Sequence, residues 1–268
     1  MTQLPRAFGR QAFGDDPANY DATRPDYPDW VYDTLAERCG LGPGCAVFEA
    51  GAGTGIATRR LLAAGADPVV AIEPDARLAA FLRASTASSA LSVVTAPFET
   101  AELSRGAFDL GVAATSFHWM NELVALNRAA ALLRADGWWA MVWNVFGDDE
   151  RPDPFHDATD ALLSDGPKSP SGGGRRGVPF ALQVNARKSA FGRCGAFADI
   201  SHEARPWELV LTADQTVALY STYSNITAYP PDERREVLAE LRRIAEDTFG
   251  GRVVRNMVTS LYLARRRA

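Results

Sequence analysis

The chain has 268 residues, 47% hydrophobic and 23% charged, and its net charge is −5. This is the composition of a soluble globular domain with a substantial core, and the acidic balance argues against a nucleic-acid partner. Three cysteines without C-x-x-C spacing argue against a disulfide framework or a zinc site. The absence of an 18-residue apolar run argues against a membrane span. We therefore expect one cytoplasmic domain, a monomer or homodimer, without a metal.

Strand-like and helix-like segments alternate between residues 29 and 145, which predicts a parallel sheet with crossover helices. The expected strands cover residues 45–48, 68–72, 91–94, 108–113 and 137–143. The expected helices cover residues 30–39, 56–64, 75–84 and 121–133.

The alternation stops at residues 147–180, which are rich in glycine and proline. Such a stretch inside a compact domain predicts a lid, a binding loop or a disordered segment. The later patterns predict helices over 180–191, 214–223 and 232–249 and strands over 204–211 and 252–263. The sum is a single α/β domain with seven strands and helices on both faces.

The turn after the first strand is the most informative motif. Glu49 precedes Gly51, Gly53 and Gly55, and a helical pattern begins at Ile56. Glycines permit a sharp turn and a close approach of backbone N–H groups to a ligand, and the next helix directs its positive end there. A dinucleotide fingerprint, G-x-G-x-x-G, needs its third glycine at position 56. The spacing thus favours a different nucleotide-like ligand, the alternative being a tight turn that binds nothing.

Polar and aromatic residues follow the next two strands. An acid about twenty residues beyond the turn, here Glu73 before Pro74, suits the hydroxyls of a ribose, although it could also be a helix N-terminal acid. After the third strand, Ala96, Phe98 and Glu99 could enclose an adenine, although Phe98 could equally be a core residue.

The fourth strand is followed by Thr115 and then by Phe117, His118 and Trp119. Ring faces attract cations, so this cluster suits a positively charged ligand. His118 could be a general base, a hydrogen-bonding wall residue or a packed turn residue.

A leader with Tyr20 and Arg24 precedes the first helix, and prolines at 25 and 28 fix its path. An arginine can clamp a carboxylate with two hydrogen bonds. The alternative is a surface leader that merely packs on the sheet.

In this order the motifs resemble those of the class I S-adenosylmethionine-dependent methyltransferases, in the small-molecule branch that includes trans-aconitate methyltransferase. The resemblance implies a Rossmann-like sheet of order 3-2-1-4-5-7-6 with strand 7 antiparallel. It also implies S-adenosylmethionine as cofactor, S-adenosylhomocysteine as product, and an N-terminal cap over the cofactor at residues 1–28. The 147–180 segment would then be a flexible insertion or lid after strand 5 that contributes to the acceptor site.

The family's site can be carried over residue by residue. Glu49, Ala50 and the Gly51–Gly55 backbone would hold the methionine portion, with Tyr20 and Arg24 at its carboxylate. Glu73 and Pro74 would meet the ribose, and Ala96, Phe98 and Glu99 the adenine. Thr115 and Phe117 would border the sulfonium, with His118 as a candidate catalytic residue.

The expected activity is methyl transfer to a small, partly apolar or aromatic metabolite through an oxygen, nitrogen or carbon acceptor. The candidate acceptor-lining residues are His118, Trp119, Trp143, Asn144, Phe146, His156, Tyr220 and Tyr223. Lys168, Arg175 and Arg176 would matter only for an acidic acceptor. Two alternatives stay open: a non-methylating protein of this fold that binds the same cofactor, and an NAD-dependent oxidoreductase.

Overall fold

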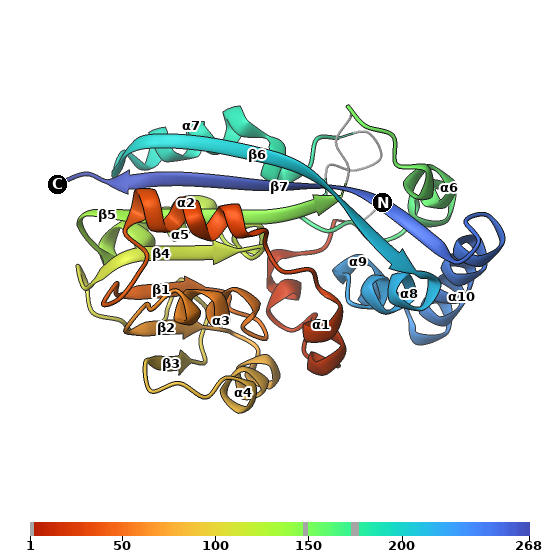
Figure 1. Cartoon of the computed structure of the whole chain (residues 1–268), viewed down its shortest axis with the longest axis horizontal. Helices are drawn as coiled ribbons and strands as arrows, with labels where there is room; N and C mark the ends of the chain where they lie inside the picture. Colours follow the sequence, from red (N-terminus) through yellow and green to blue (C-terminus); the bar gives the residue numbers. More distant parts are fainter. Residues whose placement is uncertain (1–2, 147–149, 173–176) are drawn as a thin grey trace.

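The computed structural model describes residues 3–146, 150–172 and 177–268. Its centre is a seven-stranded sheet of order β3-β2-β1-β4-β5-β7-β6 (Figure 1). Strands β1 to β5 pair in parallel, and β7 is antiparallel to both β5 and β6. The expected strand order and the antiparallel seventh strand are thereby confirmed.

The strands are β1 (Val47–Ala50), β2 (Val69–Ile72), β3 (Leu91–Val94), β4 (Phe108–Ala114), β5 (Leu133–Phe146), β6 (Phe197–Thr212) and β7 (Arg252–Arg266). The helices of the first half are α1 (Pro17–Thr23), α2 (Asp29–Cys39), α3 (Ile56–Ala63), α4 (Ala76–Ser85) and α5 (Glu122–Leu132). Those of the second half are α6 (Pro154–Leu163), α7 (Val184–Cys194), α8 (Ala213–Ser221), α9 (Ser224–Thr227) and α10 (Pro231–Asp247). Short 3₁₀ turns are η1 (Arg6–Arg10), η2 (Phe117–Trp119) and η4 (Phe180–Leu182).

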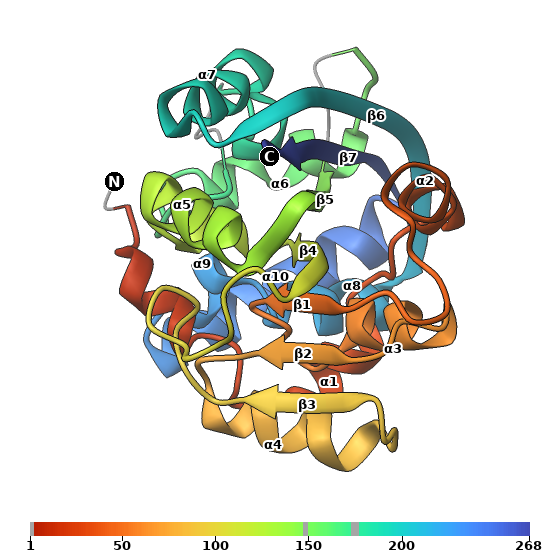
Figure 2. The same ribbon diagram turned by 90° about the vertical axis from the view of Figure 1, so that its left-hand side faces the viewer.

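Helices cover both faces of the sheet, α2 and α3 on one side and α5 and α7 on the other (Figure 2). Side chains alternate along a strand, so successive residues serve different faces. Val47 packs with Leu35 and Leu61 beneath α2 and α3, whereas Phe48 packs with Trp139 and Leu126 beneath α5. Burial on both faces explains why the first strands read as continuous apolar runs.

A third cluster lies beyond the carboxyl ends of the parallel strands, where α6, α8, α9 and α10 gather beside α1 (Figure 1). Its apolar side chains include Phe155, Tyr220, Ile226 and Leu241. This helical layer stands over the edge of the sheet at which ligands bind in open α/β folds. Among the described residues, no helix is both long and apolar enough to span a bilayer.

Three helices were not expected from the sequence: α1 in the leader, α6 inside the 147–180 segment, and the four-residue α9. An aspartate precedes α1 (Asp16) and α6 (Asp153); its side chain accepts a hydrogen bond from the backbone N–H three residues later, and both helices have proline at their first position. These are N-capping signals. The helix expected over 180–191 is instead the turn η4 followed by α7.

Candidate functional site

The glycine turn leaves β1 at Ala50 and enters α3 at Ile56. Gly51, Gly53 and Gly55 all have positive φ, a region that favours glycine. A Cβ at Gly51 would meet the Ser116 side chain at 2.6 Å, whereas a Cβ at Gly53 would meet nothing within 4 Å. Gly51 is therefore closed in by protein, and Gly53 faces the open side of the turn.

Glu73, directly after β2, supports this turn through its carboxylate. Its Oε2 accepts a hydrogen bond from the Gly53 N–H at 2.8 Å, and its Oε1 accepts one from the Asp75 N–H at 2.9 Å. Burial raises the Glu73 pKa to about 7. The acid expected to meet a ribose thus lies beside the glycine turn.

Glu49 is buried at the floor of the turn, where its Oε2 accepts a hydrogen bond from the Thr58 hydroxyl. Burial raises its pKa to about 7, and the nearby Glu73 carboxylate adds to that rise. Two adjacent buried carboxyls make this region favourable for a cationic ligand.

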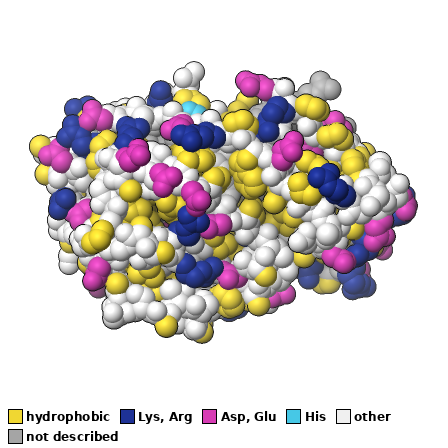
Figure 3. Space-filling model, in the orientation of Figure 1, with side chains coloured by type: hydrophobic (Ala, Val, Ile, Leu, Met, Phe, Trp, Pro, Cys, Tyr) yellow, Lys and Arg dark blue, Asp and Glu magenta, His cyan; other side chains and the backbone are white. Residues whose placement is uncertain are grey.

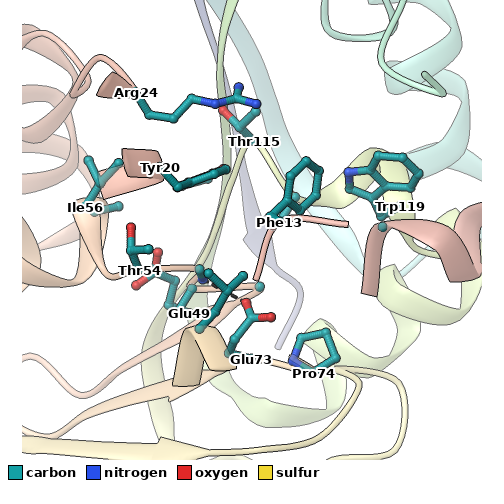
Figure 4. Close-up of a pocket in the computed structure, with 18 of the residues that line it drawn as sticks. Phe13, Tyr20, Arg24, Glu49, Thr54, Ile56, Glu73, Pro74, Thr115 and Trp119 are labelled. Atoms are coloured by element: carbon teal, nitrogen blue, oxygen red, sulfur yellow. Dashed lines mark hydrogen bonds between the residues drawn. The ribbon is translucent and has the colours of Figure 1, made fainter. Parts of the chain in front are cut away.

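A cleft opens above the turn at the carboxyl edge of the sheet (Figure 4). Its empty space, counted out to solvent, is about 1130 Å³, on the scale of small-molecule sites. Of the predicted site residues, those lining it are Tyr20, Arg24, Glu49, Gly51, Gly53, Glu73, Pro74, Phe98, Glu99, Thr115, Trp119, Asn144, Phe146 and Tyr223. One cleft thus collects residues from the leader, from the carboxyl ends of the five parallel strands β1 to β5, and from the second half of the chain.

Arg24 is held rigidly at one side of this cleft. Its Nε donates to the Thr222 hydroxyl at 2.9 Å and its Nη2 to the Thr222 carbonyl at 2.8 Å. Its guanidinium lies 4.9 Å from the ring centroid of Tyr20 and 4.5 Å from that of Tyr223. The arginine therefore joins the leader to the segment between α8 and α9.

Asn144 lines the cleft, yet its amide is occupied by protein partners. Its Nδ2 donates to the carbonyls of Pro25 and Asp26, and its Oδ1 accepts from the Thr259 hydroxyl at 2.6 Å. Asn144 therefore fixes the leader against the sheet.

Eight predicted residues do not line the cleft: Ala50, Gly55, Ala96, Phe117, His118, Trp143, His156 and Tyr220. Gly55 caps α3, Ala96 is partly buried against the hydrophobic core, and Ala50, Phe117 and Trp143 are buried in that core. His156 is exposed on α6, and Tyr220 accepts a hydrogen bond from the buried Arg255. After β4, Phe117 and His118 are both buried, whereas Trp119 faces the cleft.

His118 is the candidate catalytic residue most affected by this placement. Its ring is buried, and its Nδ1 accepts a hydrogen bond from the Trp143 indole N–H at 3.1 Å. Burial lowers its pKa to about 3, helped by the positive charge of Arg24. The side chain is a neutral residue packed in the turn η2, which was one of the three roles left open by the sequence.

The sequence analysis did not identify several lining residues. Phe13 and Tyr27 come from the leader, and Met257 comes from the middle of β7. Tyr27 lies between the two leader prolines at 25 and 28, and its hydroxyl lies 2.7 Å from the Thr115 hydroxyl. Met257 carried no sequence signal, because it follows Arg255 and Asn256 in a strand of mixed polar and apolar residues that does not single it out. Lys168 does not line the cleft, and Arg175 and Arg176 lie outside the described residues.

Charge on the molecular surface is mixed. Figure 3 shows basic and acidic side chains scattered over the visible face, without a continuous patch of one sign. The arrangement does not resemble a phosphate-backbone track.

Residues 48–141 match the family model described as a methyltransferase domain. An uncharacterized methyltransferase-like protein of Schizosaccharomyces pombe is 26% identical over 242 residues, covering 88% of this chain and 86% of the relative. An uncharacterized methyltransferase of Mycobacterium tuberculosis is 27% identical over 237 residues, covering 87% of this chain and 85% of the relative.

Solved structures share the fold. A putative type II methyltransferase from Anaeromyxobacter dehalogenans superposes with a TM-score of 0.63 at 21% identity, covering 91% of this chain and 97% of that one. Phosphoethanolamine N-methyltransferase 2 of Haemonchus contortus, bound to S-adenosylhomocysteine, has a TM-score of 0.54 at 11% identity, covering 90% of this chain and 53% of that one. The 4+2 cyclase SpnF has a TM-score of 0.59 at 14% identity, covering 100% of this chain and 99% of that one.

Proposed function

We propose that this chain is a class I S-adenosylmethionine-dependent methyltransferase and that it methylates a small, partly apolar or aromatic metabolite. The observation that carries the cofactor assignment is the pairing of the Gly53 N–H with the Glu73 carboxylate. This contact aligns the ribose acid with the open side of the glycine turn, which leaves room for a ligand.

The cleft's own residues fit the cofactor's parts. Glu49 and the glycine turn would hold the methionine amino group, and Tyr20 with Arg24 its carboxylate. Glu73 would accept from the ribose hydroxyls, while Phe98 and Glu99 would border the adenine. Three acids of the cleft, Glu49, Glu73 and Glu99, lie in this half and suit the positive charges of the ligand.

The other half of the cleft supports a small acceptor with apolar or aromatic surface. Its walls are Phe13, Trp119, Phe146, Tyr223 and Met257. Such walls exclude water and orient a planar or apolar molecule, as in most small-molecule sites.

S-adenosylmethionine supplies an activated methyl group on a sulfonium. The chain's task is to orient an acceptor against that group in a water-poor cleft, which can lower the barrier by about 7–11 kcal/mol. His118 is turned away and Asn144 is occupied by protein partners. The proposed mechanism therefore relies on positioning, with an acceptor that needs no proton removed by a histidine.

A second candidate is a non-methylating reaction that keeps the cofactor in place. The 4+2 cyclase SpnF shares this fold over almost its whole length. The fold alone therefore does not decide between methyl transfer and a non-methylating reaction, and this second candidate is retained. An oxidoreductase using NAD is supported only by the general form of the turn.

The test has two stages. First, thermal shift and calorimetry compare S-adenosylhomocysteine with NAD(H), for the wild type and for Gly53→Val and Glu73→Ala. We expect binding of S-adenosylhomocysteine that both variants weaken; stabilisation by NAD(H) alone would overturn the assignment. Second, tritiated methyl donor is incubated with a metabolite collection. Absence of transfer to every compound, despite tight cofactor binding, would favour the non-methylating candidate.

A further inference from the structure

Thr115 follows β4 in a backbone conformation that its side chain makes costly. Its φ is +50°, in the left-handed region, where a β-branched residue is rare and strained. The other described non-glycine residues with positive φ, Asp136 and Asp199, are of a type that enters this region more readily. The Thr115 N–H donates to the Val142 carbonyl at 2.8 Å, which holds the backbone in place. A glycine would adopt this conformation without strain, so the threonine side chain points to a use of its own.

Tyr27 holds the Thr115 side chain. Its hydroxyl lies 2.7 Å from the Thr115 hydroxyl, and its ring is buried. The Tyr27 N–H donates to the Asp26 carboxylate at 2.7 Å, and Asn144 donates to the Asp26 carbonyl at 3.1 Å. Burial raises the Tyr27 pKa well above its ordinary value, so the phenol keeps its proton. The pair of hydroxyls is therefore neutral, and the leader fixes its geometry.

Both residues line the cleft, and Thr115 has hydrogen-bonding capacity left. A hydroxyl carries one O–H and two lone pairs. Whichever member of the pair donates, Oγ1 of Thr115 keeps at least one lone pair, and no other hydrogen bond of this oxygen occurs among residues 3–146, 150–172 and 177–268. Thr115 can thus accept a hydrogen bond from an N–H or O–H of a bound molecule.

The ionisable residues of the cleft decide between these two donors. Among the described lining residues they are three glutamates, two arginines and three tyrosines, with no histidine or lysine. Glu49 and Glu73 belong to the proposed cofactor half, and Glu99 lies 3.7 Å from Arg10. A hydroxyl becomes acidic on methylation and must pass its proton to a base, whereas an amine can keep its hydrogens as an ammonium. The cleft therefore favours a nitrogen acceptor.

Aromatic rings suit the positive charge that such a reaction leaves on nitrogen, because ring faces attract cations. The lining rings of Tyr20, Phe146 and Tyr223 each have an arginine guanidinium at 4.3–4.9 Å already. Phe13 and Trp119 have no such partner among the described residues, and their ring centroids lie 6.0 Å apart. Figure 4 shows these two rings side by side. They form the part of the wall that suits an ammonium.

Given the proposed function, on which this rests, we propose that the methyl acceptor is a neutral amine and that Thr115 contacts it, with Tyr27 as the positioning residue. Oγ1 of Thr115 accepts one N–H, which turns the nitrogen lone pair toward the methyl group. This lone pair forms the new N–C bond, the C–S bond breaks, and its electron pair stays on sulfur as the thioether of S-adenosylhomocysteine. The nitrogen keeps its hydrogens as an ammonium beside Phe13 and Trp119 and loses one to water after release.

Sinefungin tests this contact without a known acceptor, because it carries an amine where S-adenosylmethionine carries the methyl group. Calorimetry compares its affinity with that of S-adenosylhomocysteine, which lacks both groups. Thr115→Val removes the hydroxyl and keeps the branched shape. It should weaken sinefungin about tenfold and leave S-adenosylhomocysteine unchanged, whereas Thr115→Ser should bind both like the wild type. Equal losses for the two ligands, or no loss for either, would overturn the contact.

Tyr27→Phe and the control Tyr32→Phe test the positioning role. Tyr32 also bonds Asp26, at 3.2 Å, and does not line the cleft. Tyr27→Phe should weaken sinefungin about threefold at wild-type affinity for S-adenosylhomocysteine, and Tyr32→Phe should weaken neither. A matching loss of S-adenosylhomocysteine affinity in Tyr27→Phe would make Tyr27 a purely structural residue.

The screen with tritiated methyl donor tests the acceptor class. Mass spectrometry of the labelled product should place the methyl group on nitrogen, and a methyl group on oxygen or carbon would overturn the amine. Failure of the wild type to bind S-adenosylhomocysteine would instead overturn the proposed function itself.

Discussion

The indole N–H of Trp143 donates to Nδ1 of His118 at 3.1 Å, and both rings are buried behind the wall of the cleft. The bond joins η2, which follows β4, to β5, and the carboxyl ends of these two strands border the acceptor half. It fixes Nδ1 of the imidazole as a hydrogen-bond acceptor, while burial keeps His118 neutral.

Replacing His118 by Gln should preserve binding of S-adenosylhomocysteine and alter the pH dependence of stability. The His118 pKa is about 3 in the folded protein against about 6.5 when unfolded. Below about pH 6.5 the unfolded chain therefore gains a proton that the folded chain refuses, and stability falls as pH falls toward 3. Urea unfolding at pH 7 and pH 5 should show a smaller loss in His118→Gln than in the wild type.

The exposed His156 on α6 supplies the control, and His156→Gln should retain the wild-type difference. The rate of methyl transfer can also be followed against pH. If the wild type and His156→Gln lost activity below about pH 6.5 and His118→Gln did not, His118 would be reinstated as a general base.

Cofactor affinity should rise with pH through neutrality. Glu49 and Glu73 both have a pKa of about 7, raised first of all by burial, and their proposed roles require the ionised carboxylate. Below pH 7 the protons must be released before binding, so affinity should increase between pH 6 and pH 8. Calorimetry with S-adenosylhomocysteine in two buffers of different ionisation enthalpy measures both affinity and proton release. Glu49→Gln should flatten the increase; an unchanged slope in that variant would assign the titration elsewhere.

The strands and the glycine turn could be predicted because their signals are local, whereas the order of the strands was implied only by the family resemblance. Buried parallel strands are apolar runs, and the turn needs glycines in succession. The direction of the aromatic residues after β4 could not be predicted, because η2 rotates Trp119 outward and His118 inward over a single turn. Nor could Met257, since its exposure to the cleft depends on the antiparallel register of β7 with β5. Sequence spacing does not encode that pairing.

Arg24 should distinguish ligands with and without a carboxylate. Its Nε and Nη2 donate to Thr222, the rings of Tyr20 and Tyr223 lie against the guanidinium, and no described carboxylate pairs with it. Arg24→Met keeps an apolar stem of similar length. It should weaken S-adenosylhomocysteine by about tenfold, the scale of a charge-assisted hydrogen bond, and leave methylthioadenosine, which lacks the amino-acid part, unaffected. Equal losses for both ligands would mean that Arg24 acts only by holding the cap.

The buried pair of Asp153 and Arg255 should matter for stability and for the acceptor half, and not for the cofactor half. Arg255 Nε lies 2.9 Å from the Asp153 carboxylate, and its guanidinium stands 4.3 Å from the ring centroid of Phe146, which lines the cleft. Asp153→Asn leaves a buried charge unpaired and should cost about 3–5 kcal/mol in urea unfolding. The exposed pair of Asp232 and Arg235 provides the matched control, and Asp232→Asn should unfold like the wild type.

Because Phe146 stands between Arg255 and the cleft, loosening the pair should move an acceptor wall and leave the glycine turn in place. Folded Asp153→Asn should therefore bind S-adenosylhomocysteine with wild-type affinity and transfer labelled methyl more slowly to whichever acceptor the metabolite screen identifies. Parallel losses of cofactor affinity and transfer would show that α6 supports the whole cleft. Wild-type transfer in a variant of reduced stability would confine the pair to a structural role, with the acceptor wall held by the packing of Phe146 against Tyr223 at 5.5 Å between ring centroids.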